Sequence, residues 1–432
     1  MCAEKSAEWV ERDRRRVWHG FTQMASYGSN RPVMVERAEG RELIDVDGRR
    51  HLDAISSLWV TTLGHRVPEL DSALRDQVAK VAHSTLLGNG NTVVVELAEA
   101  LAEVVPVDDP RFLFASDGAA AVEQALKIAF QYWWNRGDRD RTVFVALGEA
   151  YHGDTVGSLS LGDSGFGTDL FEPLRFERVL RTPGYSHPDW ADRAIEVVRA
   201  NSERLAAAVI EPVVQGASGM FVAEPGDVGR FGRACKEAGV LLVCDEVATG
   251  FGRTGRMFAS ELCGLRPDIL CLGKGLSAGY MPMSATVASG AVADAFDGED
   301  LGPRTLYHGH SYGGNALAAA VALRHLQLFS ETHVLDNVAA RSEQLAKRLA
   351  ELRGNPCVAG VRAQGLMAGI ELAPPEPGLR WGRRVCSAAV ERGVLLRPLG
   401  DVVVLMPILT STAPEIDRIV DTLEAAIGEV CG

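Results

Sequence analysis

An aspartate and a lysine, Asp245 and Lys274, each follow an apolar run and precede a glycine-containing turn. Such runs are typical of strands in an open α/β sheet, which binds its ligands where the strands end. Either residue alone could be an ordinary polar group at a strand end. An amine can bond covalently to an aldehyde, and a carboxylate can keep a ring nitrogen protonated. As a pair, the two residues therefore suit the cofactor pyridoxal phosphate.

The residues around this pair resemble the class III aminotransferases, which are fold-type I enzymes. The resemblance is carried by residues 244–255 and 272–280 and extends over nearly the whole chain, through 18–24, 53–59, 83–88, 151–155, 211–216, 308–311 and 396–400. It implies pyridoxal phosphate as cofactor, with Lys274, Asp245 and Tyr151 as catalytic residues, and a homodimer whose active sites are built from both subunits. Within class III, this set of segments is most similar to the branch that aminates 7-keto-8-aminopelargonate in biotin synthesis.

The length of the chain indicates how many domains it forms, and its charge argues against some classes of partner. With 432 residues the chain exceeds the roughly 250 to 300 residues at which single cores stop growing, so two domains are expected. A net charge of −13 offers no basic surface for nucleic acid or for an anionic membrane. No apolar run approaches the ~18 residues of a membrane span, and residues 1–16 lack the apolar core of a signal peptide. We therefore expect a cytoplasmic enzyme that acts on small molecules.

The pattern along the chain predicts three segments: 1–60 as the N-terminal part of a small domain, 61–325 as the large cofactor-binding domain, and 326–432 as the C-terminal part of the small domain. Short strands are expected at 32–37, 42–46 and 50–54. In the large domain, helical patterns alternate with apolar runs at 112–115, 142–146, 206–210, 240–244, 269–272 and 285–288. Continuous apolar runs require helices on both faces of the sheet, so we expect an α/β fold with a mainly parallel, seven-stranded type of sheet. Beyond 326, helices are expected at 337–352, near 383–392 and at 413–427, with apolar runs at 361–372 and 402–406.

Residues 112–126 read as a strand, a glycine turn and an alanine-rich helix. A helix N-terminus supplies free N–H groups and the positive end of a dipole, which suit a phosphate. Such a turn can also be a plain connection, but its match to the family's phosphate site favours binding by the backbone of Gly118 and Ala119. Family members often carry Ser or Thr on either side of this glycine, where this chain has Asp117 and Ala119. A carboxylate beside a phosphate is unfavourable unless its side chain turns away.

The resemblance assigns further cofactor contacts. Tyr151 matches the aromatic residue that stacks on the cofactor ring, Asp154 belongs to the same pocket, and Val247 covers the opposite ring face. Ser311 aligns with a threonine that reaches the phosphate of the neighbouring subunit. A single tyrosine, without the family match, is more often a packing residue.

Arg397 is the candidate for binding the substrate carboxylate, because it follows an apolar run that would project its planar guanidinium. The alternative role for Arg397 is a structural one, an ion pair with a nearby acid such as Asp401. Trp59 is expected to wall the pocket for an alkyl chain, with a core tryptophan as the alternative. Phe21 and Gly309, together with Asp154, complete the predicted substrate site. The histidines do not have metal-ligand spacing, so no metal site is predicted; they include His65, His83, His152, His308 and His310.

The amino donor is L-lysine or S-adenosylmethionine. Users of S-adenosylmethionine carry a tyrosine, a second tryptophan and a threonine where this chain has Phe21, Leu58 and Ser311, and further polar groups where it has Gly400 and Val404. These changes remove groups that could hold a sulfonium by stacking and cation–π contact, and they resemble the lysine-using branch. Three other functions stay open: a different ω-aminotransferase, an aminomutase or decarboxylase that uses the same lysine and aspartate, and a cofactor-binding regulatory protein.

Overall fold

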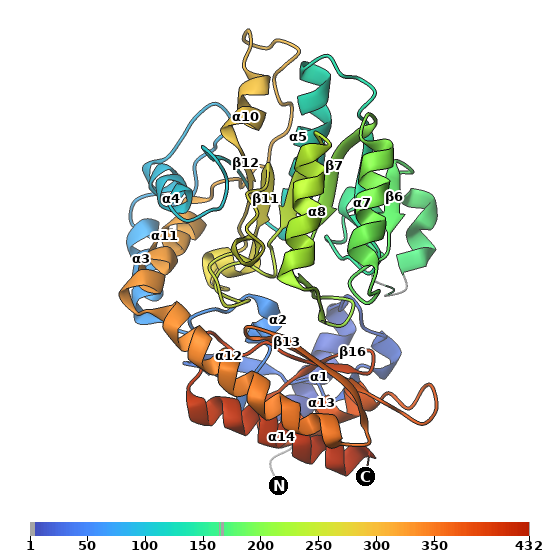
Figure 1. The fold of residues 1–432 in the computed structure, drawn as a ribbon. Coiled ribbons are helices and arrows are strands. Elements are labelled where there is room, and N and C mark those ends of the chain that lie inside the picture. Colours follow the sequence, from blue (N-terminus) through green and yellow to red (C-terminus); the bar gives the residue numbers. More distant parts are fainter. Residues whose placement is uncertain (1–4, 164, 166–167, 432) are drawn as a thin grey trace.

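A seven-stranded sheet forms the centre of the upper part of the molecule in Figure 1. The strand order is β4-β12-β11-β10-β7-β5-β6 in the computed structural model, which describes residues 5–163, 165 and 168–431. The strands are β4 (Arg111–Ala115), β5 (Val143–Leu147), β6 (Val179–Thr182), β7 (Leu205–Ile210), β10 (Leu241–Asp245), β11 (Ile269–Leu272) and β12 (Ser284–Ala288). Only β12 runs antiparallel to its neighbours, β11 and β4. The predicted α/β fold with a mainly parallel, seven-stranded sheet is thus confirmed.

Six of these strands coincide with the predicted apolar runs, and β6 is the one that was missed. It lies at the edge of the sheet and reads Val-Leu-Arg-Thr, with only Thr182 buried. An edge strand packs less of its surface than a central one, so its sequence carries little hydrophobic signal.

Helices cover both faces of the sheet, which explains why its central strands are apolar at every position. In β10, Leu241 and Val243 face α5 (Gly118–Asn135), whereas Leu242 and Cys244 face the core that includes α7 (Trp190–Asn201) and α8 (Pro225–Glu237). Figure 1 shows α7 and α8 in front of the sheet. The helices α3 (Pro68–Val78), α4 (Thr92–Ala102) and α11 (Ala316–Glu331) pack together beyond β12.

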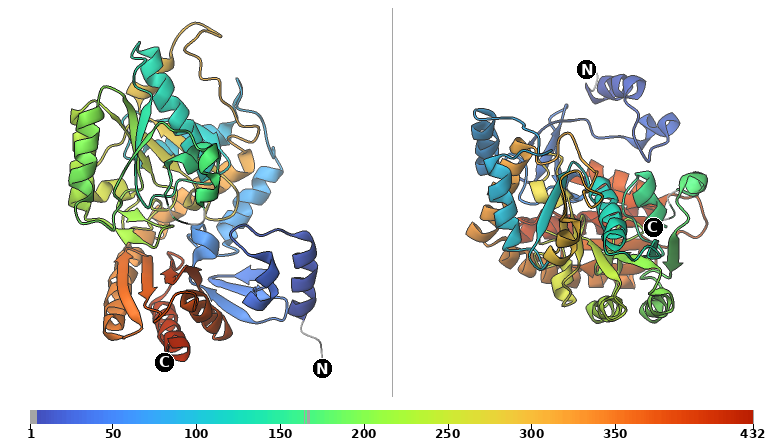
Figure 2. Two further views of the ribbon diagram at one scale, coloured as in Figure 1. Left: turned by 90° about the vertical axis from the view of Figure 1, so that its right-hand side faces the viewer. Right: turned by 90° about the horizontal axis from the view of Figure 1, so that it is seen from above.

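The lower part of the molecule combines the two ends of the chain. One sheet has the order β1-β2-β3-β15, in which β15 (Val394–Leu395) lies parallel to β3 (Arg50–Asp53). The N-terminal elements are α1 (Lys5–Arg16), β1 (Val35–Glu39) and β2 (Glu42–Asp45). A partly exposed ion pair also joins the two ends of the chain, because Arg41 Nε lies 2.7 Å from Glu415 Oε2. Figure 2 shows the N-terminal segment beside the C-terminal helices.

A second sheet, of order β13-β14-β17-β16, belongs to the C-terminal segment alone. Its strands are β13 (Val358–Gln364), β14 (Met367–Leu372), β16 (Arg397–Leu399) and β17 (Val402–Leu405). The apolar run at 361–372 is therefore a hairpin, which turns at Gly365 with a φ of +59°. Around it lie α12 (Val334–Glu351), α13 (Trp381–Glu391) and α14 (Ala413–Cys431). The domain boundaries at residues 60/61 and 325/326 stay a prediction.

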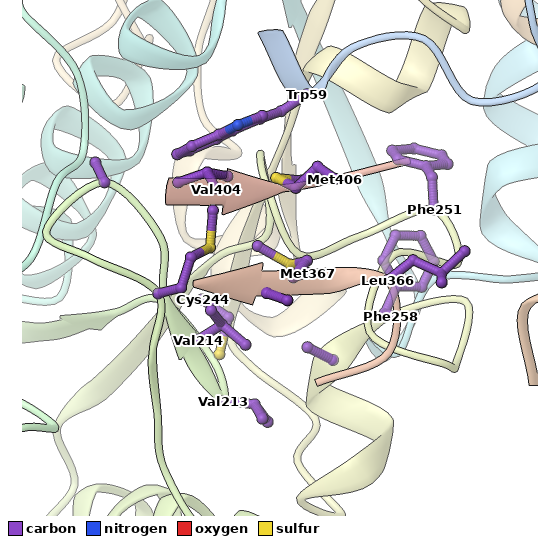
Figure 3. Close-up of a cluster of buried hydrophobic side chains, with 14 of the residues drawn as sticks. Trp59, Val213, Val214, Cys244, Phe251, Phe258, Leu366, Met367, Val404 and Met406 are labelled. Carbon is purple, nitrogen blue, oxygen red and sulfur yellow. The ribbon is translucent and has the colours of Figure 1, made fainter. Parts of the chain in front are cut away.

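A buried cluster joins the upper and lower parts. Figure 3 shows Trp59, Met367, Val404 and Met406 from the lower part packed near Cys244 of β10. Among the residues that the structure describes, no helix is long and apolar enough to cross a membrane.

Candidate active site

The side chains of the candidate site come from the carboxyl edge of the sheet. Asp245 ends β10, Glu211 directly follows β7, Lys274 follows β11 by two residues, and His152 lies in the loop after β5. Because these strands are parallel, their ends meet at one edge of the sheet. They line a cavity of about 690 Å³, whose wall includes Gly118, Ala119, Tyr151, Asp154, Val247 and Trp59.

Lys274 is half-buried and lines this cavity. Its Nζ lies 4.8 Å from the centre of the Trp59 ring. Burial lowers the pKa of the ammonium group, although the negative charges of Asp245 and Glu211 act in the opposite direction. Its backbone has a φ of +41°, a conformation that non-glycine residues rarely adopt and that is often found at functional sites. The amine is thus easier to deprotonate than a surface lysine.

Trp59 is held over this lysine by an unusual stretch of backbone. Four successive residues, 56–59, have φ values of 49°, 55°, 114° and 69°, all in the left-handed range. Polar side chains fix the stretch: Ser57 Oγ donates to Asp53 Oδ2 at 2.8 Å, and Ser56 Oγ donates to the carbonyl of Met406 at 2.7 Å. Figure 3 shows the indole beside Val404 within the buried cluster. Trp59 therefore lines the cavity and belongs to the core at once.

Asp245 is buried and its carboxylate is held at both oxygens. Oδ1 accepts a hydrogen bond from the N–H of Val247 at 3.1 Å, and Oδ2 lies 2.8 Å from Nδ1 of His152. Burial alone would lower the pKa of His152, but the bond to Asp245 and its charge outweigh burial and raise it. A carboxylate held in this way presents a fixed negative charge to the cavity.

Glu211 is a second buried acid in the same group. Its Oε1 accepts from the N–H of Tyr151 at 3.0 Å and its Oε2 from the N–H of Gly216 at 3.2 Å. Burial raises the pKa of this carboxyl to about 7; the charge of His152 opposes the rise and that of Asp245 adds to it. Glu211 thereby fixes the loop that carries Tyr151, whose phenol donates to Asp154 Oδ2 at 2.8 Å.

The predicted phosphate site lies at the start of α5. Asp117 is the N-cap residue, and its Oδ1 accepts from the N–H of Ala120 at 2.9 Å. Within the described part of the chain, the N–H groups of Gly118 and Ala119 have no acceptor. A Cβ at Gly118 would lie only 2.6 Å from Val247, so the glycine lets the helix start approach the cavity closely. Free N–H groups, a buried amine and an oriented carboxylate fit the phosphate, the aldehyde and the ring nitrogen of pyridoxal phosphate.

A second cavity, of about 790 Å³, adjoins the first and shares Trp59, Tyr151 and Lys274 with it. It extends to Phe21 and to Arg397. No ion pair joins Arg397 to Asp401 in the described residues; instead Asp401 accepts from the N–H of Gly382 at 2.9 Å. Burial, followed by the charge of Arg383, lowers the pKa of Arg397. A guanidinium without a partner among the described residues thus lines the same cavity as Lys274.

Comparison with known proteins agrees with this geometry. The model of the family "Aminotransferase class-III" matches residues 24–427. The chain belongs to the class III aminotransferases. The adenosylmethionine-8-amino-7-oxononanoate aminotransferase of Nitratidesulfovibrio vulgaris is 43% identical over 447 residues, which cover 99% of this chain and 82% of the relative.

Solved structures show the same relationship. The crystal structure of adenosylmethionine-8-amino-7-oxononanoate aminotransferase from Methanocaldococcus jannaschii has a TM-score of 0.94 at 38% identity and covers 98% of this chain and 99% of its own. An (S)-enantioselective omega-transaminase from Thermomicrobium roseum has a TM-score of 0.92 at 31% identity, with 99% of both chains covered. The aminotransferase is therefore similar, over nearly its whole length, to solved aminotransferases that carry different names.

The aminotransferase brings most of the predicted site residues to these two cavities, but not Ser311 or Gly309. The carbonyl of Ser311 accepts from Nε2 of His83 at 2.8 Å, and Gly309 packs against Leu87. The roles predicted for these residues stay predictions. Sequence reasoning assigned no role to His152 or Glu211, although both lie in the segments that carry the family resemblance. Their position beside Asp245 becomes visible only when separate strands are aligned in the sheet.

Proposed function

We propose that the enzyme transfers an amino group to 7-keto-8-aminopelargonate, which is 8-amino-7-oxononanoate, and forms 7,8-diaminopelargonate for biotin synthesis. The observation that carries the proposal is the cavity of about 790 Å³ that Lys274 and Arg397 both line. An amine and a guanidinium without a partner among the described residues, in one cavity of this size, suit a substrate whose carboxylate lies far from its reacting carbon. The names of the most similar relatives support the same substrate.

We propose pyridoxal phosphate as the cofactor. When bound, it supplies an aldehyde that carries amino groups and a ring that accepts electrons. Lys274 would hold the cofactor covalently at rest and, once released, its Nζ would act as base and then as acid within each half-reaction, moving a proton between the substrate carbon and the cofactor. Asp245 would keep the ring nitrogen protonated, and Tyr151 and Val247 would hold the two ring faces. Because donor and acceptor use one site in turn, ping-pong kinetics are expected.

A second copy of the chain would complete this site. The support for a homodimer is the position of Ser311 and Gly309, which lie outside both cavities of their own chain. The same region exposes large apolar side chains, with Leu87 61% and Tyr307 and Tyr312 each 64% exposed. We propose that this surface is covered in a dimer and that Ser311 reaches the phosphate site of the partner subunit.

L-lysine is the proposed donor. Phe21 is 61% exposed at the cavity mouth, and Leu58 and Gly400 line the same space. These residues leave an open apolar mouth without the phenol and second indole that would enclose an adenosyl group. Ser311 and Val404 also differ from the residues that S-adenosylmethionine users carry at these positions, and both differences favour lysine as the donor.

The substrate is tested by incubating the purified enzyme and cofactor with 7-keto-8-aminopelargonate and each donor, followed by mass spectrometry. The proposal expects 7,8-diaminopelargonate in amounts equal to the donor consumed. An omega-transaminase of other specificity is the second candidate, because the relative from Thermomicrobium roseum shares 31% identity over the whole chain. It would aminate aldehydes or ketones that lack the carboxylate and leave 7-keto-8-aminopelargonate unchanged. Isomerised products or CO₂ release would instead indicate an aminomutase or a decarboxylase.

A further inference from the structure

One face of α13 forms part of the wall of the second cavity. The helix contributes Arg383, Cys386, Ser387 and Val390 to the cavity, and these positions have the i, i+3, i+4, i+7 spacing of a single helix face. Arg384, the next residue along, lies outside the lining and is exposed. The helix thus directs one of two adjacent arginines towards the substrate space and the other to solvent.

Arg383 and Arg397 line the same cavity, and their elements α13 and β16 pack against each other. The charge of Arg383 contributes to lowering the pKa of Arg397. Both charges also oppose the rise that burial causes in the pKa of the Cys386 thiol, which lines the same cavity. They come from different elements, α13 and β16, so the proximity arises from packing and not from sequence spacing.

Neither guanidinium has a hydrogen bond or an ion pair with any residue that the structure describes, and the buried Nε of Arg397 has no acceptor. The described lining of this cavity contains no Asp or Glu. A third arginine of the lining, Arg31, differs because it pairs with Glu391 at 3.0 Å. Two like charges in a partly buried space are unfavourable unless an anion joins them.

We propose that Arg383 acts with Arg397 as a two-guanidinium clamp for the terminal carboxylate of a long-chain substrate. The apolar wall between the clamp and Lys274, which includes Ile55, Leu58 and Trp59, takes the alkyl chain. Arg397 places the carboxylate, and Arg383 adds a second charge-assisted contact and determines the specificity for a carboxylate over a neutral end group. The inference rests on the proposed function only in taking the substrate to be an ω-functional carboxylic acid.

The test measures binding of nonanoate to the cofactor-loaded enzyme by titration calorimetry, with nonanamide as the neutral probe of the same length. In Arg383→Gln, the Kd of nonanoate is expected to rise about tenfold or more, as for the loss of a bond to a charged group. Nonanamide binding is expected to stay within about twofold of that of the wild type. Arg384→Gln is the matched control, because it removes the same charge one position along the helix and should alter neither probe. Arg383→Lys, which keeps the charge without the fork, should recover part of the nonanoate affinity.

An unchanged nonanoate Kd in Arg383→Gln would overturn the clamp, as would an equal loss for nonanoate and nonanamide, which would indicate a packing role. With the keto acid, the variant should raise KM and leave kcat nearly unchanged. The clamp and the proposed substrate can fail separately. If 7-keto-8-aminopelargonate is not aminated but nonanoate binding depends on Arg383, only the substrate is wrong. If the keto acid is aminated and Arg383→Gln binds nonanoate normally, only the clamp is wrong.

Discussion

Nδ1 of His152 lies 2.8 Å from Oδ2 of Asp245, and both side chains are buried. The two residues stand 93 positions apart, after β5 and at the end of β10. The ring and the N–H of Val247 hold one carboxylate oxygen each, so the carboxylate cannot rotate freely. We therefore propose that His152 is a positioning residue for the charge that Asp245 would offer to the cofactor ring.

Replacing His152 by Leu should lower kcat by roughly ten- to a hundredfold, the range expected for losing one hydrogen bond to a charged group. The cofactor should remain bound. His152→Asn, which keeps a donor, should recover part of the rate, and the exposed His333→Leu should have no effect. Steady-state kinetics over pH, with the visible absorbance of the cofactor as a second readout, provide the measurement. An unaltered rate and an unaltered pH profile in His152→Leu would show that His152 does not position Asp245.

Glu211→Gln should change how the stability of the cofactor-free enzyme depends on pH. The pKa of Glu211 is raised from 4.5 to about 7 in the folded state, so the folded state binds more protons than the unfolded state between these values. The associated stability is present below pH 4.5 and is lost as pH rises through about 7, by about 3 kcal/mol. The glutamine cannot ionise and avoids this loss.

The Tm of Glu211→Gln relative to the wild type should therefore rise between pH 5 and pH 8, as followed by thermal unfolding. Glu376→Gln, at an exposed position, should show a constant difference. A constant difference for Glu211→Gln as well would show that the buried carboxyl does not titrate in this range.

Asp117→Ser should tighten cofactor binding severalfold. Serine keeps the N-cap hydrogen bond to Ala120 and removes a negative charge beside the phosphate site. Asp117→Ala separates the two effects, because it loses the cap as well, at a cost of ~1 kcal/mol to the helix. The prediction is tested by measuring the Kd of pyridoxal phosphate for the wild type and both variants by equilibrium dialysis. Weaker binding in the serine variant would mean that Asp117 makes a favourable contact.

Lys274→Ala should abolish both turnover and the covalent attachment of the cofactor. After borohydride reduction, peptide mapping of the wild type should place the cofactor label on Lys274 alone. Lys347→Ala, at an exposed position of α12, serves as the control and should be labelled like the wild type. A label on another lysine would overturn the assignment.

L-lysine should convert the yellow enzyme to its amino-bearing form faster than S-adenosylmethionine does. The reason is the open mouth formed by Phe21, Leu58 and Gly400, which lacks the phenol and the second indole of the S-adenosylmethionine users. Stopped-flow spectra with each donor at equal concentration give the comparison. Much faster bleaching by S-adenosylmethionine would contradict the assignment of the donor.

The central strands and the residues at their ends could be predicted because their physical signals are local. A strand buried on both faces must be apolar at every position, so β10 and β11 are visible in the sequence, and Asp245 and Lys274 stand where those runs end. The edge strand β6 and the hairpin at Gly365 were not recognised, because an exposed edge needs few apolar residues and a turn of this kind depends on one glycine.

Lys274, Asp245 and the glycine turn at Gly118 could be recognised in the sequence by residue type and spacing, and the class III family that they indicate is confirmed by the comparisons. The cofactor and the roles of these residues stay proposals. Only the tertiary structure decided which distant groups support them. His152 and Glu211 reach Asp245 because parallel strands bring their ends to one edge, and Arg383 reaches Arg397 because α13 packs on the sheet that contains β16. Contacts between side chains far apart in the chain depend on how elements pack, and no local pattern of residues encodes that packing.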